Sequence, residues 1–147
     1  MAEIYFYHLE HQQLSVILPD LLRSNLERGI RIAVQTSVPE NLERLSASLW
    51  AEDISFLAHG YGEDNAVGQT IWLGADAANP NSATYRFFVQ GTLPLDLEHL
   101  QRALIIVDAN SEEALINARS EWKKRKSEGH ALSYWKQDDD RLWANFT

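Results

Sequence analysis

Residues 103–107 read Ala-Leu-Ile-Ile-Val, and Asp108 follows them directly. Five consecutive apolar residues are typical of a strand that is buried on both faces of a sheet. A helical pattern begins at a cap at Asn110 or Ser111 and continues to about Glu128, with carboxylates in its first turn. A doubly buried strand next to a long helix is typical of parallel sheets that are covered by helices.

The same alternation of strand and helix continues on both sides of this stretch. Further strand patterns occupy Ile4–Leu9, Ile30–Gln35, Thr70–Leu73, Thr84–Val89, Ala131–Lys136 and Arg141–Phe146. Helical patterns follow the first two of these strands, and Gly60–Gly68 is expected to be a glycine-rich loop. We therefore predict a single domain over residues 1–147 with a three-layer α/β/α fold. Its central sheet should be largely parallel and mixed at an edge.

The composition places the chain among ordinary globular proteins. It is 45% hydrophobic and 23% charged, and it carries 13 Lys and Arg against 21 Asp and Glu, for a net charge of −8. The absence of cysteine excludes disulfides, thiolate catalysis and cysteine-ligated zinc. We expect no signal peptide, and no apolar run approaches the ~20 residues of a membrane helix, so a cytoplasmic protein without membrane contact is expected.

The sequence lacks the motifs of nucleotide binding and of catalysis. The turn after the first predicted strand, residues 10–13, has no glycine and begins with a carboxylate, which disfavours a phosphate site. No GxxxxGK[ST], GxGxxG or GxSxG motif occurs, and no two histidines have the i, i+4 spacing of a helical zinc site. We predict no catalytic residues, no metal and no cofactor. A nucleotide-binding or small-molecule-binding α/β enzyme remains the alternative function.

A basic cluster lies at residues 119–126, which read RSEWKKRK and hold five of the 13 basic residues. Lys124 and Arg125 flank a helix face formed by four residues, namely Arg119, Trp122, Lys123 and Lys126. One interpretation is a solvated helix end whose cations match the helix dipole. Another is a cationic groove with an aromatic floor, which suits an acidic peptide ending in an aromatic residue. Direct binding of single-stranded DNA is a third, although the net charge disfavours it.

A second apolar cluster joins Leu49-Trp50 to residues 55–59, which read Ser-Phe-Leu-Ala-His. Large apolar side chains at a helix end and in the following segment can belong to the core. They can equally form an exposed docking patch for a partner protein. The sequence alone leaves both interpretations open.

The order of these blocks along the chain resembles the chi subunit family of bacterial DNA polymerase III, an accessory subunit of the clamp-loader assembly. The residues that carry the resemblance are Ile4–Leu9, Leu49-Trp50, 55–59, 68–73, 104–108, Ala118-Arg119, Trp122-Lys123 and Gly129. The resemblance implies an α/β/α fold without enzymatic activity and a role in DNA replication within the polymerase III clamp-loader complex.

The resemblance also implies two protein partners. The first is the acidic C-terminal tail of single-stranded-DNA-binding protein, which ends in a phenylalanine with a free carboxylate. Arg119 matches the family arginine that grips this carboxylate, and Trp122, Lys123 and Lys126 complete the expected tail site. The second partner is the psi subunit, or a helicase of the DNA-repair type, docking at Trp50, Phe56 and His59. Contact with nucleic acid should be mostly indirect.

Overall fold

The structure is a computed structural model, and it describes residues 2–26, 29–50, 59–61 and 70–147, with only the backbone at residues 50 and 59–61. Its strands are β1 (Glu3–Leu9), β2 (Ile32–Thr36), β3 (His59–Tyr61), β4 (Ile71–Gly74), β5 (Tyr85–Val89), β6 (Arg102–Asp108), β7 (Ala131–Gln137) and β8 (Trp143–Asn145). Its helices are α1 (Leu14–Asn25), α2 (Leu42–Trp50) and α3 (Glu112–Ser127), with a 3₁₀ turn η1 (Pro39–Asn41) before α2.

The described strands form one sheet in the order β3-β4-β2-β5-β6-β1-β7-β8. Neighbouring strands are parallel except for β7 and β8, which form an antiparallel hairpin at one edge. The apolar stretch 103–107 forms the middle of β6, which pairs with β5 and β1, and all five of its residues are buried. The predicted largely parallel sheet with a mixed edge is therefore confirmed.

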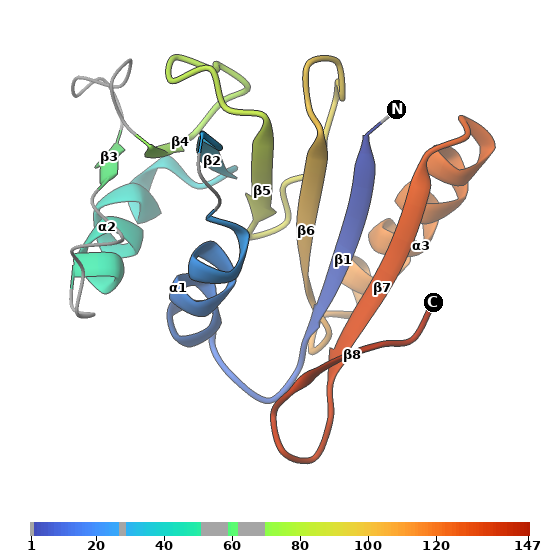
Figure 1. Ribbon diagram of the computed structural model, residues 1–147. Helices are drawn as coiled ribbons and strands as arrows, with labels where there is room; N and C mark the ends of the chain where they lie inside the picture. Colours follow the sequence, from blue (N-terminus) through green and yellow to red (C-terminus); the bar gives the residue numbers. More distant parts are fainter. Residues whose placement is uncertain (1, 27–28, 51–58, 62–69) are drawn as a thin grey trace.

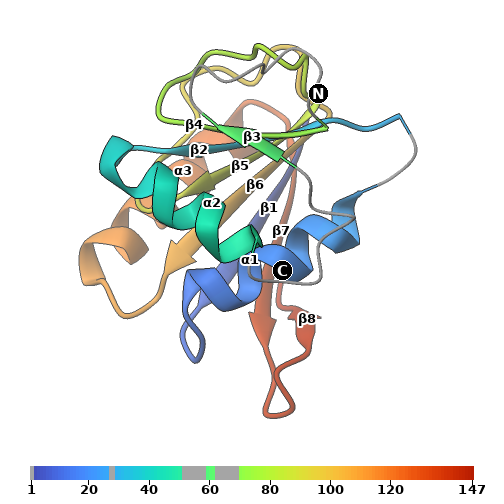
Figure 2. The same ribbon diagram turned by 90° about the vertical axis from the view of Figure 1, so that its left-hand side faces the viewer.

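Helices cover both faces of the sheet, so the predicted three layers are confirmed (Figures 1 and 2). Side chains of β1 alternate between the two faces, because successive residues of a strand point in opposite directions. Tyr7 and Leu9 belong to the core under α1 and α2, whereas Ile4 and Phe6 belong to the core under α3. The α3 face is the one on which the basic cluster lies.

One local expectation was wrong. The segment Gly60–Gly68 was expected to be a loop, but Gly60 and Tyr61 belong to β3, which pairs in parallel with β4 in the register His59↔Ile71. A three-residue strand is too short to show the alternation of period two that identifies strands. Main-chain pairing with β4 forms it instead.

Within the described residues, no helix combines the length and the apolar character that crossing a membrane requires.

Candidate functional site

Helix α3 has matched residues at both of its ends. The Ser111 hydroxyl caps the start by accepting the backbone N–H of Ala114 at 3.1 Å, and Glu112 and Glu113 occupy the first turn. Lys124, Arg125 and Lys126 occupy the last turn, where positive charge complements the helix dipole. Gly129 follows with φ +90°, a left-handed conformation that suits glycine just after a helix.

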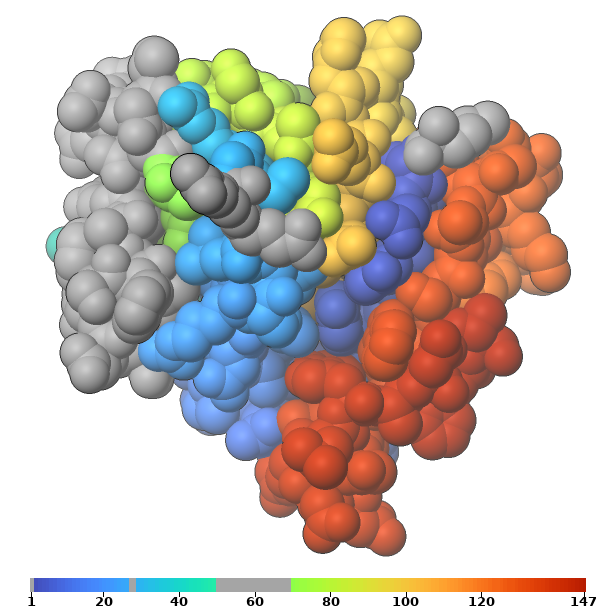
Figure 3. Space-filling model, in the orientation of Figure 1, coloured from blue at the N-terminus to red at the C-terminus, as the bar shows by residue number. Residues whose placement is uncertain are grey.

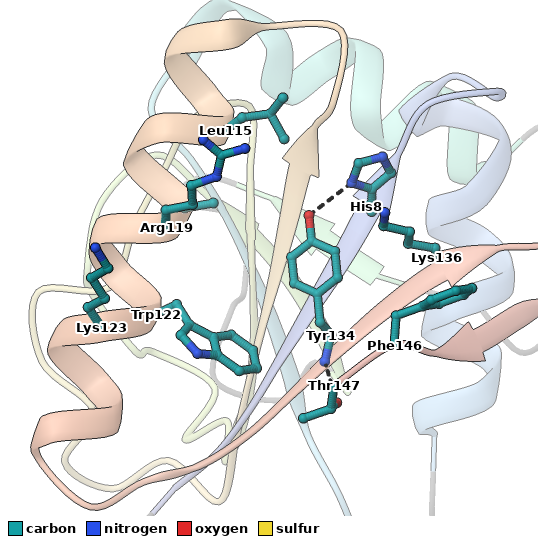
Figure 4. Close-up of a pocket in the computed structure, with 10 residues that line it drawn as sticks. His8, Leu115, Arg119, Trp122, Lys123, Tyr134, Lys136, Phe146 and Thr147 are labelled. Atoms are coloured by element: carbon teal, nitrogen blue, oxygen red, sulfur yellow. Dashed lines mark hydrogen bonds between the residues drawn. The ribbon is translucent and has the colours of Figure 1, made fainter.

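A pocket of ≈ 560 Å³ lies between α3 and the β7–β8 hairpin (Figure 4). The residues that line it come from α3, from β1 and from the hairpin. They are His8, Leu115, Ala118, Arg119, Trp122, Lys123, Tyr134, Lys136, Phe146 and Thr147. Most of the exposed surface of this lining is apolar, although many of its side chains also carry a polar group.

The floor of the pocket is aromatic. Trp122 packs on Phe6 with ring centroids 5.3 Å apart, and Tyr134 lies 6.2 Å from each of them. The Tyr134 hydroxyl is hydrogen-bonded to Nδ1 of His8 at 2.9 Å. Burial raises the pKa of Tyr134, while the positive charge of Arg119 acts in the opposite direction. The phenol is therefore neutral at pH 7, and the pocket keeps its positive charge.

The charged side chains of the pocket are all basic. Arg119 and Lys123 are exposed on α3, and Lys136 is half-buried on β7. No Asp or Glu lines the pocket, and none of the described acidic residues forms an ion pair with these three cations. In a chain with a net charge of −8, such a site attracts an anion that has an apolar part.

Arg125 does not belong to this cationic surface, although the sequence pattern grouped it there. Its side chain is buried, and its Nε donates to Glu121 at 2.6 Å. The same guanidinium donates to Glu128 at 3.0 Å and to the backbone oxygen of Pro94 at 2.7 Å. Its charge is therefore neutralised within the protein, and its role is structural.

The structure brings together three of the four residues expected on the helix face. Arg119, Trp122 and Lys123 line the pocket, whereas Lys126 is exposed and lies outside the lining. Lys126 is seven residues beyond Arg119, which is about 10 Å along the helix axis. Lys126 can therefore act on a ligand in the pocket only through long-range electrostatic attraction.

A comparison with protein-family models matches residues 1–133 to the DNA polymerase III chi subunit, HolC. The chain belongs to this family. A search of curated proteins gave no match. As a chi-family protein, the chain is an accessory subunit associated with the DNA polymerase III complex in DNA replication. The matched region includes all of α3 and ends at Ser133.

The sequence pattern missed the half of the pocket that comes from outside α3. His8, Tyr134, Lys136, Phe146 and Thr147 line it, and four of these follow the end of the chi-family match. Strand alternation does place Tyr134 and Lys136 on one face of the predicted strand 131–136. The missing information was that β7 pairs with β1, beside the face on which α3 packs.

The predicted docking patch falls largely outside the described residues. Trp50 ends α2 and His59 begins β3, but their side chains, like the whole of Phe56, lie outside the described part. The predicted docking role of these three residues stays a prediction.

The described residues contain no group of three His, Asp or Glu side chains that could hold a metal ion. Asp108, which ends the buried strand β6, accepts the backbone N–H of Asn110 at 3.0 Å and so closes the turn before α3. This contact gives the carboxylate a local structural role.

Proposed function

We propose that this chi-family protein connects the clamp-loader assembly of DNA polymerase III to single-stranded-DNA-binding protein by binding the acidic C-terminal tail of that protein. The observation that carries the proposal is the pocket beside α3, where three cations and no acidic residue surround an aromatic floor. A peptide that ends in a phenylalanine and a free carboxylate has the complementary chemistry.

Each part of such a peptide finds a suitable group in the pocket. Arg119 offers a planar fork of N–H donors, which can hold a terminal carboxylate through two parallel hydrogen bonds. The terminal phenyl ring fits the apolar surface of Trp122 and Tyr134, where aromatic rings gain from packing against one another. Lys123, with Lys126 further along α3, attracts acidic residues upstream in the peptide.

The protein contributes binding and no chemistry of its own in this proposal. The two alternatives are a nucleotide-binding or small-molecule-binding α/β enzyme and a direct binder of single-stranded DNA. The sequence lacks the phosphate-binding turn of a nucleotide-binding enzyme and a catalytic cluster, and the net charge of −8 disfavours binding of DNA.

One set of titrations separates the three functions. The protein is titrated with an acidic peptide ending in phenylalanine, with a single-stranded oligonucleotide, and with ATP. We expect saturable binding of the peptide that weakens as salt rises, and little binding of the other two. Binding of the oligonucleotide or of ATP without binding of the peptide would contradict the proposal.

We also propose that Trp50, Phe56 and His59 dock the second partner, a psi-type subunit or a helicase of the repair type. Trp50→Ala should abolish capture of that partner and leave peptide affinity unchanged. If the variant unfolds instead, as expected for a core tryptophan whose loss costs ~3–5 kcal/mol, the docking role is wrong.

A further inference from the structure

The β7–β8 hairpin forms a second wall of the pocket, and its pocket-lining residues lie beyond the region that matches the chi family. The match ends at residue 133, whereas Tyr134, Lys136, Phe146 and Thr147 line the pocket. Figure 4 shows Arg119 and Lys123 on α3 on one side, and Lys136 and Phe146 on the other side. The match itself therefore assigns no role to these four residues.

Strand β8 is held in place independently of the pocket. Its antiparallel pairing with β7 places Lys136 opposite Ala144, and the Phe146 N–H donates to the backbone oxygen of Tyr134 at 2.7 Å. Trp143 points to the other face of the sheet, where its ring packs edge-on against Tyr7 with centroids 5.0 Å apart. Trp143 thus anchors the hairpin in the core under α1, and this leaves Phe146 available on the α3 face.

Phe146 and Lys136 combine an apolar surface and a positive charge at the pocket rim. Phe146 is 59% exposed, so its ring is accessible to a ligand at the rim of the pocket. The ammonium of Lys136 lies 5.6 Å from the centre of the Phe146 ring and has no ion-pair partner among the described residues. Figure 3 shows the hairpin, coloured orange to red, at the outer surface of the molecule.

We propose that Lys136 and Phe146 are specificity-determining residues that contact the acidic tail upstream of its terminal phenylalanine. This inference rests on the proposed function of the pocket. Lys136 pairs with an upstream carboxylate, while Arg119 holds the terminal one. Phe146 covers the apolar part of the peptide, which then lies between α3 and the hairpin. The two walls together make the pocket selective for a tail that is acidic before its aromatic end.

The test uses the full chain and two synthetic peptides in calorimetric titrations. One peptide has three aspartates, two alanines and a terminal phenylalanine with a free carboxylate, and the other has asparagines in place of the aspartates. Lys136→Met should lower the affinity for the aspartate peptide about threefold to fivefold and leave the affinity for the asparagine peptide unchanged. Phe146→Ala should lower the affinity for both peptides about tenfold, because each peptide loses the same apolar contact.

Control variants separate this inference from the proposed function. Leu142→Ala removes a side chain that is 64% exposed on the same hairpin but does not line the pocket, so it should bind both peptides like the wild type. Phe146→Asp should weaken the aspartate peptide more than Phe146→Ala, because it places a negative charge beside an anion. Circular dichroism checks that each variant is folded.

The outcomes are distinguishable. If Arg119→Ala weakens binding but the Lys136 and Phe146 variants bind like the wild type, the proposed role of Lys136 and Phe146 is wrong. The proposed function of the pocket is then unaffected. Equal weakening of both peptides by Lys136→Met would also overturn the role of Lys136. If Arg119→Ala itself has no effect, the proposed function of the pocket fails.

Discussion

Two arginines of α3, six residues apart, have opposite environments. Arg125 is buried and donates to two carboxylates and a backbone oxygen, whereas Arg119 is exposed at the rim of the pocket. A guanidinium whose donors are satisfied inside the protein has few left for a ligand. At the scale of single residues, the number of internal partners therefore separates a structural arginine from a binding one.

Arg125→Ala should lower the stability of the protein without affecting the pocket. The substitution leaves the carboxylate of Glu121, whose side chain is only 8% exposed, without its cation. Breaking a buried ion pair in this way costs ~3 kcal/mol of the free energy of unfolding. Urea denaturation measures the loss, and Lys124→Ala, an exposed neighbour, should change stability by less than about 0.5 kcal/mol. Equal stability of the two variants would contradict the structural role of Arg125.

His8 should make stability depend on pH. Burial lowers the pKa of His8 from 6.5 and outweighs its hydrogen bond to Glu10, which acts in the opposite direction. The folded protein therefore favours the neutral ring, and protonation favours the unfolded chain. The free energy of unfolding should be complete above the unfolded pKa and fall as the pH decreases through the lower folded pKa. Urea denaturation at about pH 7.5 and about pH 5.5 should show a smaller loss for His8→Gln than for the wild type. An equal loss would assign the effect to other groups.

At the scale of elements, residues 119–126 of α3 have two roles, because some of them pack inside the protein and others line the pocket. Its buried side presents Glu121 and Arg125 to the protein, and its pocket side presents Arg119 and Lys123. The helix period places these two sets on different faces. A change at the start of α3 should therefore also affect the helix that holds the pocket cations in position.

Ser111→Ala should test the cap of this helix. The variant loses the acceptor for the backbone N–H of Ala114, and loss of such a cap costs ~1 kcal/mol. Thermal unfolding should show a lower Tm by about 2–4 °C, with Ser111→Asp close to the wild type because aspartate also caps helices. An unchanged Tm for Ser111→Ala would show that α3 is held by packing alone.

At the scale of the whole molecule, charge is distributed unevenly. The chain has a net charge of −8, yet the pocket contains three cations and no acidic residue. Exposed charges act over about one Debye length, so we expect the pocket to attract a nearby carboxylate although the chain as a whole is negatively charged. This arrangement favours a short acidic peptide over a long polyanion.

The sequence predicted the elements with strong local patterns and missed those that depend on distant contacts. The sequence predicts the buried strand 103–107, the cap at Asn110 or Ser111 and the helix face with Arg119. Each of these features depends on residues that lie within about one helix length in the chain. Strand β3 and the burial of Arg125 depend on partners in other elements of the fold, namely β4 and the segment that contains Pro94. The β7–β8 wall likewise required the pairing of β7 with β1.

In the proposed function, Arg119 holds the terminal carboxylate of an acidic peptide in the pocket beside α3. The decisive measurement is a calorimetric cycle with wild type and Arg119→Ala, each titrated with a phenylalanine-ended acidic peptide bearing a free or an amidated C-terminus. Arg119→Ala and amidation should each weaken binding by ~2 kcal/mol, about 30-fold, and the two losses should not add, because both remove the same contact. Full affinity of Arg119→Ala, or equal affinity for the free and the amidated peptide, would contradict the claim.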